Sequence, residues 1–246
     1  MTLTNKTALI SGAAGAIGAA VARSLLAMGA RVILLDRAAE PLAVLTSSLG
    51  DQAVSVVQDL TDESGLRVAM AQLVGRFGCI DVLVNNAGIL TPTKAIATSM
   101  EEWRRVMAVN LDAAFILSQE VLPGMRAARW GRIINMSSYA AKSGGLTAGT
   151  AYSVSKTAMI GLTYSIARET AGEGITVNAV APAYVMSAMV SEQLTDAQRA
   201  AQLAQIPVGR FCQPEEVAHA VAFLASPLAG FITGEVVDLN GGLHFD

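Results

Sequence analysis

Tyr152 and Lys156 lie four positions apart in the stretch YSVSK. Residues at i and i+4 of a helix share one face, so the phenol and the ammonium group would be neighbours. Because a nearby positive charge favours the phenolate, we expect Lys156 to lower the pKa of Tyr152 from its usual value of about 10. Such a tyrosine can remove a proton from an alcohol or donate one to a ketone. The pair alone also fits the solvated face of an ordinary helix.

The stretch SGAAGAIG contains three evenly spaced glycines, Gly12, Gly15 and Gly18. It lies between a short apolar run and a helical pattern, where free backbone N–H groups and the helix dipole favour a pyrophosphate. Glycine lets the backbone approach the phosphates closely. We expect Ala16 in the first helical turn, with its methyl group beside the pyrophosphate, and Gly15 to take any unusual backbone angle. A plain small-residue turn is the alternative.

Asp36 ends the second apolar run, 18 residues after Gly18. In a sheet that binds dinucleotides, a carboxylate at this place accepts hydrogen bonds from the hydroxyl groups of the adenosine ribose. A 2′-phosphate would face this negative charge and be disfavoured. Asp36 therefore predicts NAD rather than NADP. The neighbouring Arg37 either lines the adenine or points to solvent.

Short β-branched runs alternate with longer segments of helical period along the chain. We predict strands over residues 7–10, 31–35, 53–59, 80–88, 132–138, 174–182 and 234–242, and helices over 16–28, 41–49, 61–77, 101–129, 151–171 and 214–224. Thr61 or Asp62 is the expected N-cap of the third helix. Pro123 is expected to bend the longest helix or to end its first part. Residues 183–210 show no strong period and are predicted to be irregular or weakly helical.

The predicted strands are continuous apolar runs, which indicates a parallel sheet that is buried on both faces. We predict an α/β fold over residues 1–246: a single-domain, Rossmann-type, doubly wound parallel sheet of seven strands with helices on both faces. A substrate-loop insertion is expected at about 184–211. Ligands of such sheets bind at the carboxyl ends of the strands, and Ser138 follows the fifth predicted strand.

Composition narrows the classes of partner. The net charge is −3, whereas a nucleic-acid partner would require a basic surface. No apolar run reaches the length of a membrane span, and the N-terminal run is too short for a signal peptide. We therefore expect a cytoplasmic protein with neither a nucleic-acid nor a membrane partner.

The cysteines and histidines predict no metal site. Cys79 and Cys212 have no metal-type spacing, and we interpret both as free core thiols. His219 and His244 are the two histidines, and neither lies in a metal-ligand pattern.

Taken in order, these motifs resemble the short-chain dehydrogenase/reductase family over essentially the whole chain. The glycine turn matches at Gly12 and Gly18, the family's N-N-A-G motif is Asn85–Gly88, and the C-terminal ITGEVVDLNGG is of the family type. The family's tetrad falls on Asn110, Ser138, Tyr152 and Lys156.

The chain also departs from the family pattern. Ala16 stands where the family has a glycine, and Ala183 replaces the glycine of a Pro-Gly pair. Ser138 and Tyr152 are 14 residues apart, so the loop between them looks one residue longer than is common. We favour Ser138 over Ser137 as the tetrad serine.

The resemblance implies that Tyr152 exchanges a proton with the substrate while hydride passes to or from NAD. Lys156 would hold the nicotinamide ribose, Ser138 would orient the substrate oxygen, and Asn110 would position a relay water. The expected cofactor-binding residues are Gly12, Gly15, Ala16, Ile17, Gly18, Asp36, Arg37, Asp59, Leu60, Asn86, Ala87, Gly88, Tyr152, Lys156, Pro182, Val185 and Ser187. The expected substrate residues are Ser138, Tyr139, Tyr152, Tyr184 and Met189. A homotetramer is the family expectation.

We therefore predict an NAD-dependent oxidoreductase that interconverts a secondary alcohol, such as a polyol or sugar-like compound, and its ketone. The alternative is a 3-oxoacyl-thioester reductase of lipid synthesis, a group that usually prefers NADPH and meets an acidic carrier protein. Asp36 opposes NADPH, and Glu173 puts an acid where that group often has a base. A dinucleotide-binding protein without turnover is a further alternative, which the intact tetrad disfavours.

Overall fold

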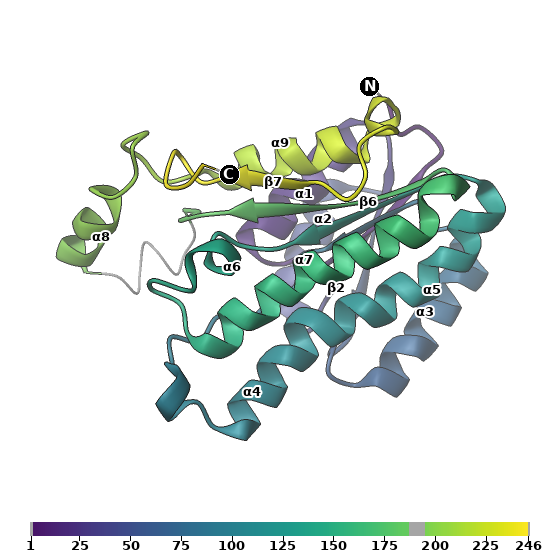
Figure 1. Ribbon diagram of the computed structural model, residues 1–246. Helices are drawn as coiled ribbons and strands as arrows, with labels where there is room; N and C mark the ends of the chain where they lie inside the picture. The colour runs from purple at the N-terminus through teal and green to yellow at the C-terminus, as the bar shows by residue number, and fades with distance from the viewer. Residues whose placement is uncertain (1, 187–194, 246) are drawn as a thin grey trace.

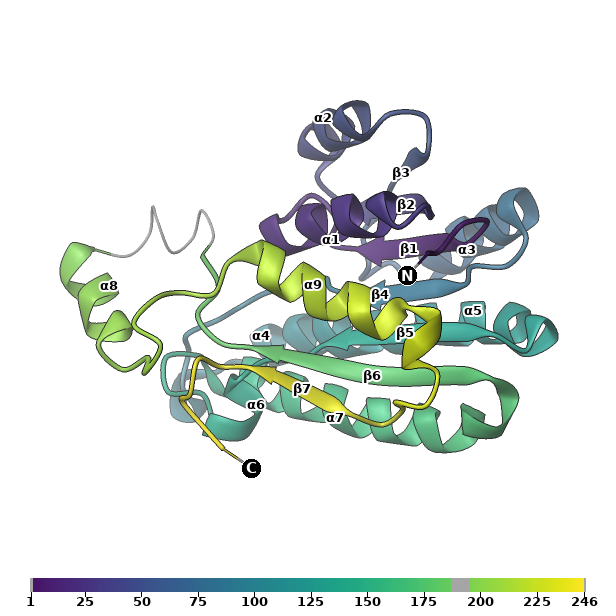
Figure 2. The ribbon, with the colours of Figure 1, turned by 90° about the horizontal axis from the view of Figure 1, so that it is seen from above.

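One sheet of seven parallel strands forms the centre of the molecule, in the order β3-β2-β1-β4-β5-β6-β7. The structure is a computed structural model that describes residues 2–186 and 195–245. Figure 2 shows the strands side by side, with α1 and α9 in the nearer layer. The strands are β1 (Thr7–Ser11), β2 (Arg31–Asp36), β3 (Ala53–Val57), β4 (Val82–Asn85), β5 (Gly131–Met136), β6 (Ile175–Pro182) and β7 (Val236–Leu239). The predicted doubly wound parallel sheet is confirmed.

Helices cover both faces of the sheet, as Figure 1 shows with α9 and α1 above the strands and α7, α5 and α3 below them. The upper layer consists of α1 (Ala16–Ala27), α2 (Ala39–Leu49) and α9 (Pro214–Ala225). The lower layer consists of α3 (Glu63–Phe77), α5 (Ala113–Ala128) and α7 (Thr150–Thr170). Three further helices are α4 (Met100–Met107), α6 (Ala140–Ser143) and α8 (Asp196–Leu203).

The two-sided burial explains why the inner strands are rich in apolar residues. Successive residues of β1 point to opposite faces, so Ile10 packs with Leu25 in one core and Leu9 packs with Leu117 in the other. All four side chains are fully buried. A polar residue at either strand position would lose its water contacts without gaining a partner, which favours the continuous apolar pattern.

The longest predicted helix is interrupted, but not where Pro123 predicted. A π turn over Ala108–Asp112 separates α4 from α5, and α5 continues beyond Pro123 to Ala128. The proline lacks the N–H that would bond to the carbonyl of Gln119. Both residues are exposed, so water can take the place of that N–H. The helix therefore does not end at Pro123, and its irregular turn surrounds Asn110 instead.

Within the described part of the chain, one helical stretch is long and apolar enough to cross a membrane by length and composition alone. It spans Met100–Ala128, with a mean hydropathy of 1.2 and 44% of its most apolar window buried. Leu117, Val121 and Met125 of this stretch are buried in the core under α5. Packing against the sheet accounts for these apolar side chains.

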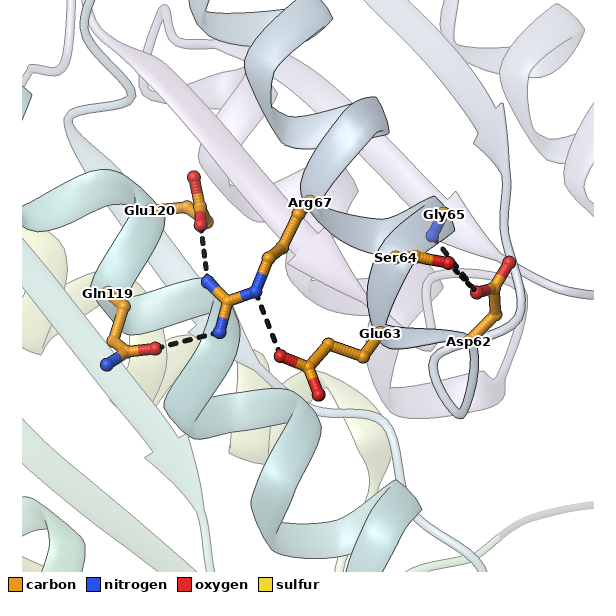
Figure 3. Close-up of polar contacts among 7 residues, drawn as sticks. All are labelled: Asp62, Glu63, Ser64, Gly65, Arg67, Gln119 and Glu120. Atoms are coloured by element: carbon orange, nitrogen blue, oxygen red, sulfur yellow. Dashed lines mark hydrogen bonds and ion pairs between the residues drawn. The ribbon is translucent and has the colours of Figure 1, made fainter.

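A surface cluster joins α3 to α5 on the lower face (Figure 3). Arg67 donates to Glu120 at 2.7 Å, to Glu63 at 3.0 Å and to Gln119 at 3.2 Å. The Asp62 carboxylate accepts from Gly65 N at 3.0 Å and caps α3, which decides between the two predicted N-caps. Because these ion pairs are largely exposed, they contribute little free energy and mainly fix how α3 lies against α5.

Candidate active site

Close backbone contacts explain two of the three glycines of the turn, Gly12 against the loop after β4 and Gly18 against the turn itself. A Cβ added at Gly12 would lie 2.7 Å from Ala87 Cα, and one added at Gly18 would lie 2.3 Å from Gly12 O. Gly12 has φ +64°, a region that favours glycine. Gly15 has φ −73° and is the N-cap of α1, so Ala16 begins the helix. Ala16 lies in the first helical turn as expected, but the unusual backbone angle lies at Gly12 and the expectation for Gly15 is wrong.

The N-terminus of α1 is suited to hold a pyrophosphate. No side chain caps this helix, so its first N–H groups lack intrahelical partners and face outward near the exposed Gly15 and Ala16. Ile17 follows in the same turn and is half-buried. Gly12 and Gly18 lie so close to neighbouring backbone atoms that neither position has room for a Cβ. These features fit a dinucleotide, and Ala16 is compatible with them.

Ser11 and Asn86 tie the glycine turn to the N-N-A-G segment. The Ser11 hydroxyl accepts from Asn86 N at 3.1 Å and from Ala87 N at 3.2 Å. The Asn86 side-chain amide donates to Ser11 O and to Gly12 O, both at 3.0 Å. Serine therefore satisfies this position, where the family usually has threonine.

Asp36 lies at the carboxyl end of β2, and two backbone groups hold its carboxylate. One oxygen accepts from Ala14 N and the other from Ala38 N, both at 3.0 Å. These bonds fix the carboxylate beside the glycine turn and leave further lone pairs for ligand hydroxyl groups. The sequence predicted that Asp36 binds the ribose of the cofactor, and the structure shows that it also anchors the glycine turn.

A cavity of ≈ 170 Å³ opens beside Asp36 at this edge of the sheet. Its lining residues are Gly12, Asp36, Arg37, Gln58, Asp59, Leu60, Ala87, Gly88, Ile89 and Val109. Seven of these ten were predicted to contact the cofactor. Gln58, Ile89 and Val109 were missed, although each is the neighbour in sequence of a predicted residue. The exposed Arg37 lines the cavity, as one of its two predicted alternatives required.

The electrostatics of this cavity are set by two acids and Arg37. The N–H and the hydroxyl of Thr61 each donate to Asp59 at 2.8 Å, and these bonds lower the pKa of the Asp59 carboxyl. The positive charge of Arg37 lowers the same pKa to a smaller extent. Asp59 is therefore ionised at neutral pH, and it adds negative charge to the cavity that Asp36 also lines.

The four tetrad residues come together at the carboxyl ends of β4 and β5. Lys156 is 3% exposed, and its Nζ lies 5.8 Å from the centre of the Tyr152 ring. The Lys156 ammonium donates to the main-chain carbonyl of Met136, the last residue of β5, at 2.7 Å. A Cβ added at Gly88 would lie 3.3 Å from Lys156 Nζ and 3.4 Å from Asn110 Oδ1. The N-N-A-G segment therefore joins the cavity beside Asp36 to the tetrad.

Burial shifts the pKa values of Lys156 and Tyr152 in the directions that favour their uncharged forms. It lowers the pKa of Lys156 from 10.5 to about 8 and raises the pKa of Tyr152. A hydrogen bond with the Ser138 side chain opposes the shift of Tyr152 without reversing it. The expected lowering of the Tyr152 pKa by Lys156 is therefore not found. The phenol is protonated at neutral pH and can donate to a carbonyl oxygen.

Asn110 is fully buried in the π turn and braces the loop after β4. Its Oδ1 accepts from Ile89 N at 2.8 Å, and its Nδ2 donates to Ile89 O at 3.1 Å and to Ser155 Oγ at 3.0 Å. Ser155 in turn donates to Tyr152 O at 2.7 Å. Asn110 thus connects the N-N-A-G loop to the first turns of the helix that carries Tyr152. Sequence reasoning missed Ser155, since a serine inside a helix carries no signal of its own.

Comparison with known proteins agrees with this geometry. The family model described as enoyl-(acyl carrier protein) reductase matches residues 12–244. The chain belongs to the short-chain dehydrogenase/reductase family. Similar curated members are the 3-oxoacyl-(acyl-carrier-protein) reductases of Vibrio cholerae, 42% identical over 99% of both chains, and of Rickettsia conorii, 43% identical over 98% of both. A solved structure described as an NAD(P)-dependent gluconate 5-dehydrogenase of Beutenbergia cavernae, with NADP bound at low occupancy, is 38% identical, covers 98% of both chains and has a TM-score of 0.92.

Within this family pattern, Ser137 and Ser138 have different surroundings. The Ser137 hydroxyl is buried and donates to Lys156 O at 2.9 Å. Ser138 is half-buried, accepts from Ala140 N at 3.1 Å and influences the Tyr152 phenol. Ser138 is therefore the serine that faces the reacting tyrosine, and Ser137 supports the backbone of α7.

The family's Pro-Gly pair is replaced here by Pro182 and Ala183, and the backbone adjusts one residue later. Ala183 avoids positive φ, whereas Tyr184 has φ +46°. The Tyr184 ring lies edge-on to Phe211 at 6.5 Å, and Cys212 N donates to Tyr184 O at 3.1 Å. These contacts hold a tyrosine in a conformation that non-glycine residues seldom adopt.

The remaining predicted pocket residues lie near this turn. Tyr139 N donates to Pro182 O at 3.0 Å, which ties the start of α6 to the end of β6. Val185 pairs with Cys212 in a short parallel bridge. Ser187 and Met189, predicted for cofactor and substrate, lie outside the described residues. The insertion expected at about 184–211 contains α8, in a stretch predicted to be irregular or weakly helical.

Proposed function

We propose that this oxidoreductase interconverts a 3-oxoacyl thioester and the corresponding 3-hydroxyacyl thioester, with NAD(H) as its cofactor. The observation that carries the reaction type is the grouping of Ser138, Tyr152, Lys156 and Asn110 at the carboxyl edge of the sheet, next to the cavity beside Asp36. When bound, the nicotinamide cofactor supplies the hydride in reduction and accepts it in oxidation.

The side chains of the tetrad would transfer the proton and orient the substrate oxygen. In reduction, the protonated Tyr152 phenol donates its proton to the carbonyl oxygen of the substrate, while Ser138 donates a hydrogen bond to the same oxygen. The resulting tyrosinate is stabilised by the nearby Lys156 ammonium. In oxidation the same proton moves back from the alcohol to the tyrosinate.

The proposed cofactor residues are those whose backbone or side-chain groups are suited to bind a dinucleotide. The uncapped start of α1, including Gly15, Ala16 and Ile17, would hold the pyrophosphate, and Asp36 would accept the ribose hydroxyl groups. Asp36 and Asp59 both disfavour a 2′-phosphate, and Arg37 is the opposing cation. The NADP in the Beutenbergia relative is the contrary observation, so cofactor choice is part of the test.

The substrate class is supported by the comparisons, which favour the thioester alternative over the polyol expected first. Curated relatives named 3-oxoacyl-(acyl-carrier-protein) reductases match nearly the whole chain at 42–43% identity. An acidic carrier protein has less support than the thioester. Glu173 is an acid where reductases that use such a carrier often have a base, and it accepts from Arg126 at 2.7 Å, which neutralises the charge of that arginine. A coenzyme A thioester is therefore the first substrate to examine.

A second candidate is oxidation of a polyol or sugar acid. It is favoured by the gluconate 5-dehydrogenase description of the structural relative and by the small polar residues in the loop over 141–150. The two candidates share the tetrad and differ in the shape of the pocket wall.

The test compares acetoacetyl-coenzyme A, gluconate and simple secondary alcohols, each with NAD(H) and NADP(H). The proposal expects acetoacetyl-coenzyme A to oxidise NADH with kcat/KM at least about tenfold above NADPH. In an Asp36→Asn variant this preference should shrink by about tenfold or more. Turnover of gluconate alone would support the second candidate, and NAD binding without any turnover would support a non-catalytic protein.

We also propose a homotetramer. Phe115, Val154 and Tyr164 are 46%, 39% and 52% exposed on α5 and α7, and Leu228 and Phe231 are 77% and 101% exposed after α9. Such apolar side chains on two outer faces are suited to contact other copies of the chain. Light scattering coupled to size-exclusion chromatography would measure the mass, and a monomer at micromolar concentration would contradict this assembly.

A further inference from the structure

The segment after β4 is docked against the loop that leads into α7, the helix of Tyr152. Gly149 N donates to Thr91 O at 2.7 Å, and Thr150 N donates to Thr93 O at 3.0 Å. A Cβ added at Gly149 would lie 2.4 Å from Thr93 O, so the two backbones are in close contact. The start of α7 is therefore positioned by residues 91–93 and not by the sheet alone.

Lys94 extends this contact to the carbonyl groups of the loop. Its Nζ donates to Gly145 O and Ala148 O, both at 2.7 Å, and approaches Leu146 O at 3.4 Å. An ammonium group has three N–H donors, and here all three are directed at main-chain carbonyls of one loop. Bonds from a charged donor are stronger than neutral ones, so this single side chain gathers residues 145–148.

The loop has need of such an anchor. Gly144 and Gly145 have φ +68° and +77°, so the chain leaves α6 through two left-handed residues. Their carbonyls have no strand or helix to bond to within this turn. An exposed lysine that gives up its rotamer freedom to hold three carbonyls loses entropy, which the bonds must offset.

We propose that Lys94 is a positioning residue that holds the loop over residues 144–149, and with it the start of α7, in place relative to Ser138. The assignment rests on the proposed function for its kinetic consequence, but its structural consequence is independent of it. Ser138 lies before this loop and Tyr152 directly after it, so a shift of the loop changes how both meet a substrate carbonyl. Small displacements of this kind weaken binding of the substrate in its reactive geometry, which raises KM, without removing any reacting group.

The experiment compares Lys94→Met, which removes the ammonium, with Lys94→Arg, which keeps a cation and its donors. Arg23→Met, which removes one exposed positive charge from α1, is the matched control. In the Met variant, hydrogen exchange of the amides over 144–150 should be about tenfold faster, and the KM for acetoacetyl-coenzyme A should rise about tenfold. The dissociation constant for NADH should stay within about twofold of the unmodified protein. The Arg variant should recover most of both losses, and Arg23→Met should change neither.

Two outcomes would overturn the assignment. One is exchange over 144–150 that is unchanged in Lys94→Met. The other is a loss of NADH affinity as large as the rise in KM, because a general disturbance of the fold would then explain both. If the unmodified protein does not turn over acetoacetyl-coenzyme A, the proposed function fails, while the exchange measurement still decides whether Lys94 holds the loop.

Discussion

The Lys156 ammonium lies 5.8 Å from the centre of the Tyr152 ring and donates its hydrogen bond to Met136 O, not to the phenol. The YSVSK pattern suggests a single effect of Lys156 on the pKa of Tyr152, whereas in the structure the lysine charge and burial act in opposite directions. The lysine is near enough to stabilise a tyrosinate once one forms, but burial keeps the phenol protonated beforehand. The phenol is thus in the protonated form, which can donate a proton.

The first prediction concerns the phenol itself. Tyr152→Phe removes the proton donor and leaves the ring, so NADH should bind with unchanged affinity while turnover falls by about 10³-fold or more. Fluorescence titration with NADH and steady-state kinetics measure the two quantities. A variant with near-normal turnover would show that another group moves the proton.

The second prediction concerns the titration of Tyr152 in the protein without added nucleotide. Because burial raises its pKa above the ordinary value of 10.0, no phenolate from Tyr152 should form near neutral pH. The near-ultraviolet absorbance of the protein minus that of Tyr152→Phe isolates this residue from the other tyrosines. A difference signal that titrates around neutral pH would instead support the lowering expected from the sequence.

The third prediction links the buried Lys156 to stability. Its pKa falls from 10.5 in the unfolded chain to about 8 in the fold, so the unfolded state binds more protons between these values. The free energy of unfolding attributable to Lys156 should therefore increase as the pH rises from about 8 to 10.5, by about 3 kcal/mol. Below about pH 8 the full cost of burying the ammonium is present.

Lys156→Met tests this dependence, because it keeps an apolar stem of similar length and removes the titrating group. The variant should be more stable than the unmodified protein at neutral pH, and this advantage should decrease toward pH 10.5, while turnover is lost. Urea unfolding at several pH values gives the difference. A variant that is less stable at neutral pH would mean that the bond to Met136 O outweighs the cost of burial.

The layers of the fold could be predicted from the sequence because the inner strands share one strong constraint. A strand that is buried on both faces is rich in apolar residues, as β1 shows with Leu9 and Ile10 in opposite cores. The break in the long helix could not be predicted, since the π turn at Asn110 depends on bonds to Ile89 from another segment. Pro123 gave a local signal that solvent exposure made ineffective.

The site shows the same division between local and distant causes. Asp36 and the tetrad positions follow from short motifs, whereas Gln58 reaches the cavity because β3 ends just before it and Val109 because it lies in the π turn. The direction of the Tyr152 pKa depends on burial by the surrounding chain, which the spacing of two residues does not reveal. Lys94 was similarly hidden, since its carbonyl partners lie over 50 positions away.

The last prediction separates the three glycines of SGAAGAIG. Gly18→Ala would place a methyl group 2.3 Å from Gly12 O, and Gly12→Ala would place one 2.7 Å from Ala87 Cα at φ +64°. Backbone atoms cannot move aside cheaply, so each variant should lose about 2 kcal/mol or more of stability and bind NADH more weakly.

Gly15→Ala is the matched control within the same turn. Its φ of −73° suits any residue, and a Cβ there would lie an ordinary 3.5 Å from Gly12 O. The variant should lose about 1 kcal/mol or less of stability, because alanine is a poorer N-cap than glycine. Its affinity for NADH should fall less than in the variants at positions 12 and 18. Urea unfolding and NADH fluorescence titration measure both effects. Equal losses at positions 12, 15 and 18 would show that the turn depends on glycine flexibility in general and not on the two close backbone approaches.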